Sequence, residues 1–289
     1  MLRGEALICF GNFMKEETLK KALSGDINAF QALFVNFQDQ LKSYLFRLTA
    51  NRNDAEDITH DAFIKAYDSL NSFRGESSLK TWVFQIATNI ARNQMQRRNR
   101  WTEDVSEQAK SLVMHSKKLT AIIETTRQST FGNYDIKEHI DTCFTCMSKT
   151  LPIENQTAII LKDVYEFTVK EIMIILGNTE GTVKYLLQDG RKTLSQIFER
   201  RCALVNKKGV CNQCSELNGW LNPKQNQQEA LMKVDLAKGS AKYDREKLLK
   251  IRTDLVKAID PLRSDGHEMQ RVLMECNQMA MGELKWPNQ

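Results

Sequence analysis

The stretch DAEDITHDAFIKAYDSLNSFRGESSLKTWVFQIATNIARNQMQRRNR, residues 54–100, decides how this chain folds. Apolar residues recur at helical spacing on both sides of a short polar turn, which predicts two amphipathic helices. In the turn, Gly75 lets the chain reverse and Ser77 or Ser78 is suited to cap the second helix. The apolar faces are Ala55, Ile58, Ala62, Ala66 and Leu70 in the first helix, and Leu79, Trp82, Val83, Ile86 and Ile90 in the second.

The two predicted helices carry opposite chemistry. The first exposes several carboxylates, whereas no acidic residue occurs between Leu79 and Trp101. The polar face of the second helix offers amide, hydroxyl and guanidinium donors, which suit phosphates and base edges. An acidic face repels nucleic acid, so we expect the first helix to meet a protein and the second to meet DNA. The alternative interpretation is two ordinary solvated helix faces.

The composition predicts an all-α protein. The 289 residues include only 4 prolines and 13 glycines, and they show no strand-like alternation. The net charge of +5 indicates little as a total, because its placement along the chain matters more. No apolar run approaches the roughly 18 residues of a membrane span, and 6–10 is too short for a signal core. We therefore expect a cytoplasmic protein without a membrane partner, monomeric when free, with Met14 as a candidate start.

The apolar pattern divides the chain into successive parts. A second strong helical stretch includes a helix closed by Gly177 and a long helix that opens near Thr179. Two helices joined by a glycine-containing turn predict a helix-turn-helix, whose second helix enters the major groove. The predicted parts are a non-structured start at 1–15, a helical domain at 16–100, a linker at 101–133, the helix-turn-helix domain at 134–201 and a cysteine-containing helical extension at 202–289.

Two of these stretches resemble a known family. The residues AEDITHDAF at 55–63 and FRGESSLKTWVFQIATNIARN at 73–93 resemble region two of bacterial RNA polymerase sigma factors of the extracytoplasmic-function, or group IV, type. His60-Asp61 stands where that family carries Gln-Glu. The residues FTVKEIMIILGNTEGTVK at 167–184 resemble region four of the same family. Asp189 and Gly190 depart from its pattern, since glycine inside a helix costs about 1 kcal/mol and a carboxylate repels phosphate.

The resemblance implies a sigma factor without catalytic activity, which binds core RNA polymerase, recognises the minus-thirty-five and minus-ten promoter elements and promotes DNA melting. Its partners would be core polymerase, promoter DNA and, as a candidate, an anti-sigma factor. The acidic helix would dock on polymerase through Asp54, Glu56, Asp57, Asp61, Phe63 and Lys65. The minus-ten element would meet Lys80, Thr88, Asn89, Arg92, Asn93, Arg97, Arg98 and Arg100. The minus-thirty-five element would meet Glu180, Thr182, Lys184, Tyr185, Gln188, Arg191 and Lys192.

The cysteines raise a separate question, because thiols in a cytoplasmic chain are expected to be reduced. Cys211 and Cys214 form a CxxC knuckle with Cys202 close upstream. A structural zinc ion needs four ligands. We predict Cys146 as the fourth, with Cys143 as the alternative and His139 a weaker one. No cofactor is required for the predicted function, and plain reduced thiols are the competing interpretation.

The sequence leaves open two alternative functions and the role of the C-terminal extension. A free-standing helix-turn-helix regulator would bind duplex DNA without polymerase, but it leaves the 54–100 pattern unexplained. A metal or thiol enzyme lacks both a Cys–His–Asp constellation and a glycine-rich phosphate loop. The extension predicts two amphipathic helices, around 248–259 and 269–279, which pack on the DNA-binding domain, block it or bind a regulator.

Overall fold

The computed structural model describes residues 16–130, 133–224, 227–232, 234–264 and 266–285. In this part of the chain the regular structure is helical, apart from an isolated β-bridge between Cys202 and Cys211. The predicted all-α class is confirmed. None of the described helices is long and apolar enough to cross a membrane. The predicted non-structured start at 1–15, including the candidate start at Met14, lies outside the described residues.

The first helical bundle begins where the sequence predicts a break. Gly25 adopts a φ of +96° after a helix at 16–23, and the Asp26 carboxylate caps α2, Ile27–Thr49, by accepting from the Asn28 amide at 2.9 Å. Helix α3, Arg52–Asp68, η1, Leu70–Ser72, and α4, Leu79–Met95, follow. Each of α2, α3 and α4 packs on the other two. Ser78 caps α4 as predicted, accepting from the Thr81 amide at 3.0 Å.

The buried face of α4 differs from the predicted one. Val83, Phe84, Ala87 and Ala91 are fully buried, whereas most of the predicted stripe is half-buried at the edge of the core. The reason is that α4 has neighbours on two sides, α2 and α3 on one and the helix-turn-helix domain on the other. A single-stripe pattern cannot describe a helix that is covered twice. The half-buried residues are Leu79, Trp82, Ile86 and Ile90.

The segment predicted as a linker contains two helices, α5, Val105–His115, and α6, Lys117–Arg127. The second domain follows with α7, Ile136–Ser148, α8, Ile153–Ile159, and η2, Ile160–Val164. Its helix-turn-helix consists of α9, Val169–Leu176, and α10, Glu180–Arg201. Thr168 and Glu171 form a capping box at the start of α9, and Gly177, with a φ of +68°, ends it.

The C-terminal extension, residues 202–285 as far as described, adds five helices. The helical pair predicted for its second half is present as α14 and α15. Helix α14 packs on α7 and α10, and α15 packs on α5, α6 and α7. The five are α11, Gln213–Leu221, α12, Gln227–Met232, α13, Asp235–Gly239, α14, Arg245–Lys257, and α15, His267–Ala280.

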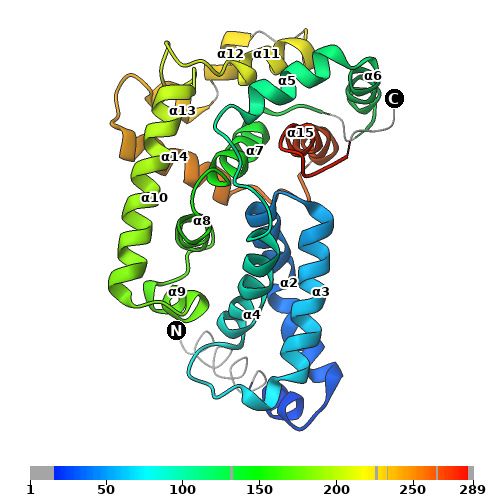
Figure 1. Ribbon diagram of the computed structural model, residues 1–289, viewed down its shortest axis with the longest axis vertical. Helices are drawn as coiled ribbons and strands as arrows, with labels where there is room; N and C mark the ends of the chain where they lie inside the picture. The colour runs from blue at the N-terminus through cyan, green and yellow to red at the C-terminus, as the bar shows by residue number, and fades with distance from the viewer. Residues whose placement is uncertain (1–15, 131–132, 225–226, 233, 265, 286–289) are drawn as a thin grey trace, which may run out of the picture.

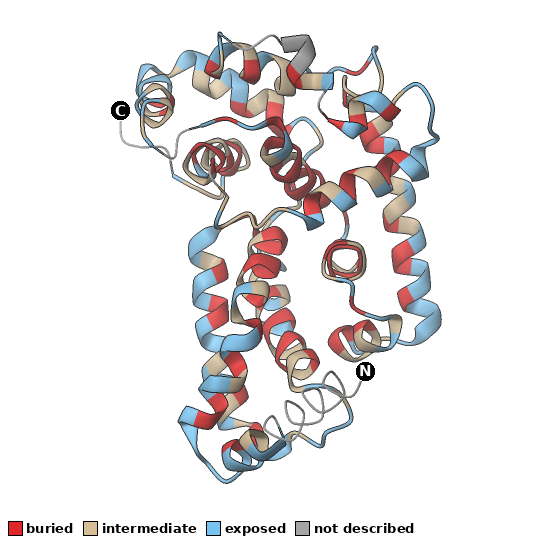
Figure 2. Ribbon diagram, turned by 180° about the vertical axis from the view of Figure 1, so that it is seen from behind, coloured by how far each residue is buried: buried red, intermediate tan, exposed pale blue. Residues whose placement is uncertain are grey.

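The two predicted domains lie against each other (Figure 1), with α3 at the lower right, α10 along the left edge, and α5, α6 and α11 across the top. A single apolar cluster runs from Phe30 in α2 through Phe84 to Phe198 in α10. Figure 2 shows buried residues where α2, α4 and α8 face one another, and exposed ones on the outer sides of α3 and α10. A second cluster joins α5, α6 and the start of α7 to the extension.

His139 in α7 makes the fold sensitive to acid. Burial lowers the pKa of His139 to about 4, so between pH 6.5 and pH 4 the unfolded chain binds a proton that the folded chain does not. The free energy of unfolding should therefore fall by about 3 kcal/mol as pH drops through this window. Urea unfolding at pH 7 and pH 4 tests this. His139→Phe should show a smaller fall than the parent, and equal falls would contradict the assignment.

Candidate nucleic-acid and protein interfaces

Two of the four acids predicted to dock on a partner are available on α3. Asp57 and Asp61 lie one helical turn apart and are exposed, and neither forms an ion pair within the described residues. The other two predicted acids are engaged. Glu56 pairs with Arg52 of the preceding turn at 3.3 Å, and Asp54 pairs with a guanidinium beyond α4. Because an unpaired carboxylate pair on a rigid helix attracts cationic side chains, this face suits a basic protein surface.

A shallow groove next to these carboxylates adds apolar surface. Its lining includes Ile64, which is 46% exposed, and Ile90 of α4. Lys65 is exposed beside it. Phe63, predicted to contact a partner, is half-buried at the edge of the core, with its ring 5.3 Å from Phe30. The groove and the two carboxylates together form a mixed acidic and apolar surface, which is typical of protein docking.

The predicted DNA-contacting face of α4 is divided by burial. Asn89, Asn93 and Arg97 are exposed. Thr88 is not available, because its hydroxyl is fully buried and shares a hydrogen bond of 2.8 Å with Tyr44. Thr88 faces α2 inside the bundle, whereas the sequence pattern predicted it on the exposed face of α4.

The remaining cations of this region contact other parts of the chain. Arg92 pairs with Glu154 of α8 at 2.5 Å, and Arg98 pairs with Asp54 at 2.5 Å. Arg100 donates to Gln156 of α8 at 2.5 Å, and burial lowers its pKa to about 10. Lys80 lies 4.7 Å from the ring centroid of Phe167. In this arrangement Arg97 is the exposed arginine among the predicted set.

Phe73, in the loop before α4, and Trp82, in the first turn of α4, form an aromatic pair. The rings of Phe73 and Trp82 lie 5.3 Å apart, and both side chains are half-buried. Gly75 adopts a φ of +74°, where most other residues are strained. A partly exposed aromatic pair offers a stacking surface for an unpaired base.

The second helix of the helix-turn-helix presents most of its predicted residues to solvent. Tyr185 is 63% exposed, and its neighbours on that face are exposed as well. Arg191 differs, because its guanidinium pairs with Asp163, and that hydrogen bond raises the arginine's pKa. Lys184 pairs with Glu180 of the same helix at 2.7 Å. The exposed residues are Glu180, Thr182, Lys184, Tyr185, Gln188 and Lys192.

The structure explains the unusual pair Asp189-Gly190 inside α10. A Cβ added at Gly190 would lie 2.6 Å from Cδ1 of Ile159 in α8, so a larger residue here would require the Ile159 side chain to move. The Asp189 carboxylate accepts from the Asn155 amide at 3.0 Å. Asp189 and Gly190, the two departures from the family pattern, therefore contribute to the packing of α10 on α8. They do not contribute to a DNA-facing surface.

The cysteine prediction is changed by the structure. Cys146 lies away from the knuckle, since its thiol donates to Met274 Sδ at 3.8 Å and accepts from Asn277 at 3.3 Å. The alternative, Cys143, lies near the other thiols. Burial raises the pKa of Cys143 and of Cys214 well above the ordinary thiol range, and Cys202 and Cys211 add to the rise at both thiols.

Arg252 of α14 lies at the centre of this thiol cluster, formed by Cys143, Cys202, Cys211 and Cys214. It is 1% exposed, donates to Cys202 Sγ at 3.4 Å and lies 3.8 Å from the ring centroid of Phe198. A buried cation among thiols would neutralise part of the charge of bound thiolates. Within the described residues, however, no three His, Cys, Asp or Glu side chains are arranged so that they could hold a metal ion. Cysteine thiolates are suitable zinc ligands, but the thiols of this cluster would have to rotate toward one another to bind the ion.

The zinc ion therefore stays a prediction, now with Cys143 in place of Cys146. Metal analysis of the purified protein should find about one zinc ion per chain. Cys211→Ser should lose it, and Cys276→Ser, which changes a buried thiol in α15 outside the cluster, should keep it. Metal-free protein with unchanged thermal stability would contradict the prediction.

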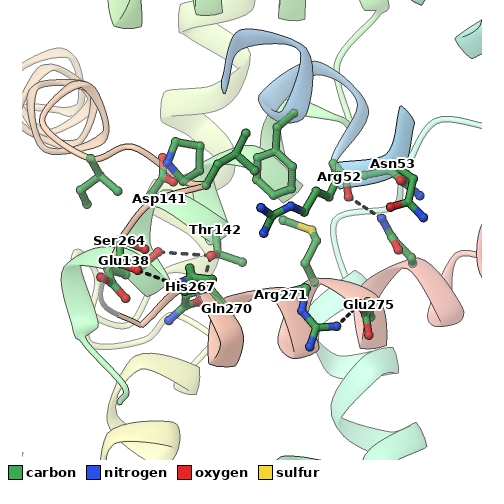
Figure 3. Close-up of a pocket in the computed structure, with 18 of the residues that line it drawn as sticks. Arg52, Asn53, Glu138, Asp141, Thr142, Ser264, His267, Gln270, Arg271 and Glu275 are labelled. Carbon is green, nitrogen blue, oxygen red and sulfur yellow. Dashed lines mark hydrogen bonds and ion pairs between the residues drawn. The ribbon is translucent and has the colours of Figure 1, made fainter. Parts of the chain in front are cut away.

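A pocket of about 320 Å³ lies between the first bundle and the extension (Figure 3). Arg52 and Asn53 line one side, whereas Thr142 and Gln270 line another. The polar side chains in it bond mainly to one another, with Thr142 donating to Gln270 at 2.9 Å. We assign it as an incompletely packed seam along which the extension meets α2, α3 and α7.

Comparisons with known proteins match the two helical domains separately. Residues 33–102 match the family model Sigma-70 region 2, and residues 141–194 match Sigma-70, region 4. The extension beyond residue 201 lies outside both. The ECF RNA polymerase sigma-E factor of Escherichia coli strain K12 is 30% identical over 191 residues, covering 65% of this chain and 91% of that protein.

Two further matches have the same extent. The RNA polymerase sigma-H factor of Pseudomonas aeruginosa is 24% identical over 185 residues, covering 64% of this chain and 93% of that protein. The solved structure of CnrH in complex with the cytosolic domain of CnrY covers 63% of this chain and 94% of that chain, at 18% identity and a TM-score of 0.45.

Proposed function

This chain belongs to the extracytoplasmic-function sigma factors of bacterial RNA polymerase, and from that premise we propose which surfaces perform each step. A sigma factor binds core RNA polymerase, recognises the minus-thirty-five and minus-ten promoter elements and promotes melting of the DNA. Matches to both region two and region four, in that order, support this function over a free-standing helix-turn-helix regulator. The chain is an initiation factor, and we propose that it acts in the cytoplasm without catalysis of its own.

The observation that carries the assignment of surfaces is the opposite charge of two adjacent helices. Asp57 and Asp61 on α3 are exposed and unpaired within the described residues, next to a partly apolar groove. Two exposed asparagines lie on α4, which has no acidic residue, and the exposed Arg97 follows the end of that helix. We assign the α3 surface to core polymerase and the α4 surface, with the Phe73 loop, to the minus-ten element.

Melting follows from these parts. Unpairing one base costs a few kcal/mol, and stacking on an aromatic side chain returns about 1–3 kcal/mol. Phe73 and Trp82 offer that stacking surface, while Asn89 and Asn93 can donate to a base edge or the backbone. The exposed face of α10 binds the minus-thirty-five duplex, with Lys184 and Lys192 on phosphates and Gln188 or Tyr185 near base edges.

Salt dependence of promoter binding by the polymerase complex tests these DNA contacts. Lys192→Ala should flatten the slope of log affinity against log salt by about 0.9, the value for one duplex phosphate contact. Arg97→Ala should flatten it by about 0.7, since its contact is to single strand. Lys242→Ala, an exposed lysine of the extension, is the matched control. Unchanged slopes in both variants would remove these residues from the DNA surface.

The free-standing alternative makes a separate expectation. Purified chain without polymerase should bind promoter duplex only weakly, because several of its cations are paired within the protein. Tight, sequence-specific binding by the chain alone would favour the alternative.

A further inference from the structure

The arrangement of the two sigma domains does not fit a promoter. The two elements lie about 25 base pairs apart, which is about 85 Å of duplex. In this structure α4 packs directly on α9. The rings of Phe84 and Phe167 lie 4.9 Å apart, and Thr81 donates to Glu171 at 3.2 Å. Because a small domain is only about 30 Å across, the domains must separate before both elements can be bound.

One buried arginine joins the two domains to the extension. Arg47 of α2 donates to Asp141 of α7 at 2.9 Å and to the Tyr165 hydroxyl at 2.6 Å. The same guanidinium donates to the carbonyl oxygens of Val256 and Ile259, at 3.0 and 2.7 Å. The end of α14 thus completes a hydrogen-bonded junction between region two and region four.

The far end of the extension forms a second junction. Lys149 of α7 contacts both carboxylate oxygens of Glu283 at 3.0 Å and the Thr49 carbonyl oxygen at 2.7 Å. Trp101 donates to the same Glu283 carboxylate at 2.7 Å. Lys149 and Glu283 are almost fully buried. Separating the domains here would break the bonds that this buried pair makes to Thr49 and Trp101.

The extension also contacts the segment that connects the two sigma domains, which must become more extended when the domains separate. Gln213 of α11 donates to the Ser106 carbonyl oxygen at 2.8 Å, and Ser129 donates to Glu268 of α15 at 2.7 Å. Lys110 pairs with Glu216 at 2.7 Å. With α15 packed on α5 and α6, the segment between the domains is folded and covered.

Exposed ion pairs also join the extension to the two sigma domains. Three pairs join α14 and the segment after it to the sigma domains. Arg245 pairs with Glu199 at 3.1 Å, and Arg263 pairs with Asp39 at 2.9 Å. The third joins Lys257 to Glu166.

We propose that residues 245–285 form an intramolecular strap that holds regions two and four in a closed arrangement, which must open before the protein can serve a promoter. This inference rests on the proposed function, because it concerns regulation of the same surfaces. The strap is the intramolecular partner of both domains, and core polymerase is the ligand that binds the open form. If the closed form dominates, apparent affinity for polymerase is reduced by the fraction that is open.

Reversing the strap's exposed cations tests the proposal without disturbing a core. The variant Arg245→Glu, Lys257→Glu, Arg263→Glu turns three attractive pairs into repulsive ones, and its side chains are exposed enough to preserve the fold. Small-angle scattering of the free protein should show a radius of gyration larger by roughly 3 Å. Binding of core polymerase at low salt should strengthen by about tenfold, and high salt should reduce the difference.

Two matched variants control for charge. Adding Glu199→Lys, Glu166→Lys and Asp39→Lys restores the three pairs and should return both measurements to the parent values. Lys207→Glu, Lys224→Glu, Lys242→Glu changes the net charge equally at exposed lysines that form no ion pair with the described residues of the sigma domains, and it should behave as the parent.

The outcomes separate the strap from the function. Unchanged radius and affinity in the reversed variant, with its fold intact by circular dichroism, would overturn the strap. The same tenfold gain in the Lys207 control variant would also overturn it, because charge alone would then be responsible. A parent protein that fails to bind core polymerase at any salt would instead contradict the proposed function, while the scattering comparison would still decide the strap.

Discussion

Reversing Asp57 and Asp61 to lysine is expected to weaken binding of core RNA polymerase by at least about 100-fold, and promoter-dependent initiation should fall with it. Both carboxylates lie on α3, where they are exposed and unpaired within the described residues. Lysine at either position would meet a basic partner surface with like charge, which costs several kcal/mol. The fold should survive, because neither carboxylate holds another described residue.

Co-elution with core polymerase and run-off transcription measure this effect. The control Asp235→Lys, Glu275→Lys makes the same change of charge on the extension, where both acids pair only with a neighbour on the same helix. We expect control protein to bind and initiate as the parent does. If the α3 variant bound polymerase with parental affinity, the docking surface would have to lie elsewhere.

Replacing Arg47 by methionine is expected to lower the free energy of unfolding by about 3–5 kcal/mol. The substitution leaves Asp141 buried without its cation. It also removes the donor shared by the Tyr165 hydroxyl and the carbonyl oxygens of Val256 and Ile259. Burial raises the pKa of Asp141 while Arg47 opposes that shift, so the pKa of this carboxyl should rise further in the variant.

Urea unfolding monitored by circular dichroism measures the loss. Arg263→Met, which removes an exposed arginine of the extension, should change stability by less than about 1 kcal/mol. The double variant Arg47→Met, Asp141→Asn should recover part of the loss, because no uncompensated charge remains buried. A single variant as stable as the parent would show that this junction does not hold the domains together.

The sequence was sufficient for local structure, because local structure depends on neighbours in the chain. Helix periodicity, the Ser78 cap and the glycine at the end of α9 all appear where they were predicted. The opposite charges of α3 and α4 could be predicted in the same way, since side-chain type is visible without a structure.

The sequence could not predict features that depend on packing between distant segments. Thr88 was placed on the outer face of α4, but contact with both α2 and α9 buries two sides of that helix. The sequence predicted that Arg92 and Arg100 contact DNA, but in the structure they contact Glu154 and Gln156 of α8. The choice of Cys143 over Cys146 depends on which face of α7 meets α14, and spacing along one helix cannot decide that.

Gly190 is a further position whose role depends on packing and could not be predicted from the sequence. In the sequence it looked like a weakness in the DNA-reading helix, because glycine lowers helix stability. In the structure it is the position where α10 comes closest to α8, and an added Cβ would meet Ile159. A departure from a family pattern can therefore report a contact that only the folded chain shows.

The most direct test of the central claim is transcription from a pool of random promoter sequences by core RNA polymerase, with and without the purified chain. We expect transcripts only when the chain is present, and the recovered templates should share two sequence elements at a fixed spacing. Equal transcription without the chain, or recovered templates with no shared element, would contradict its role as a promoter-recognition subunit.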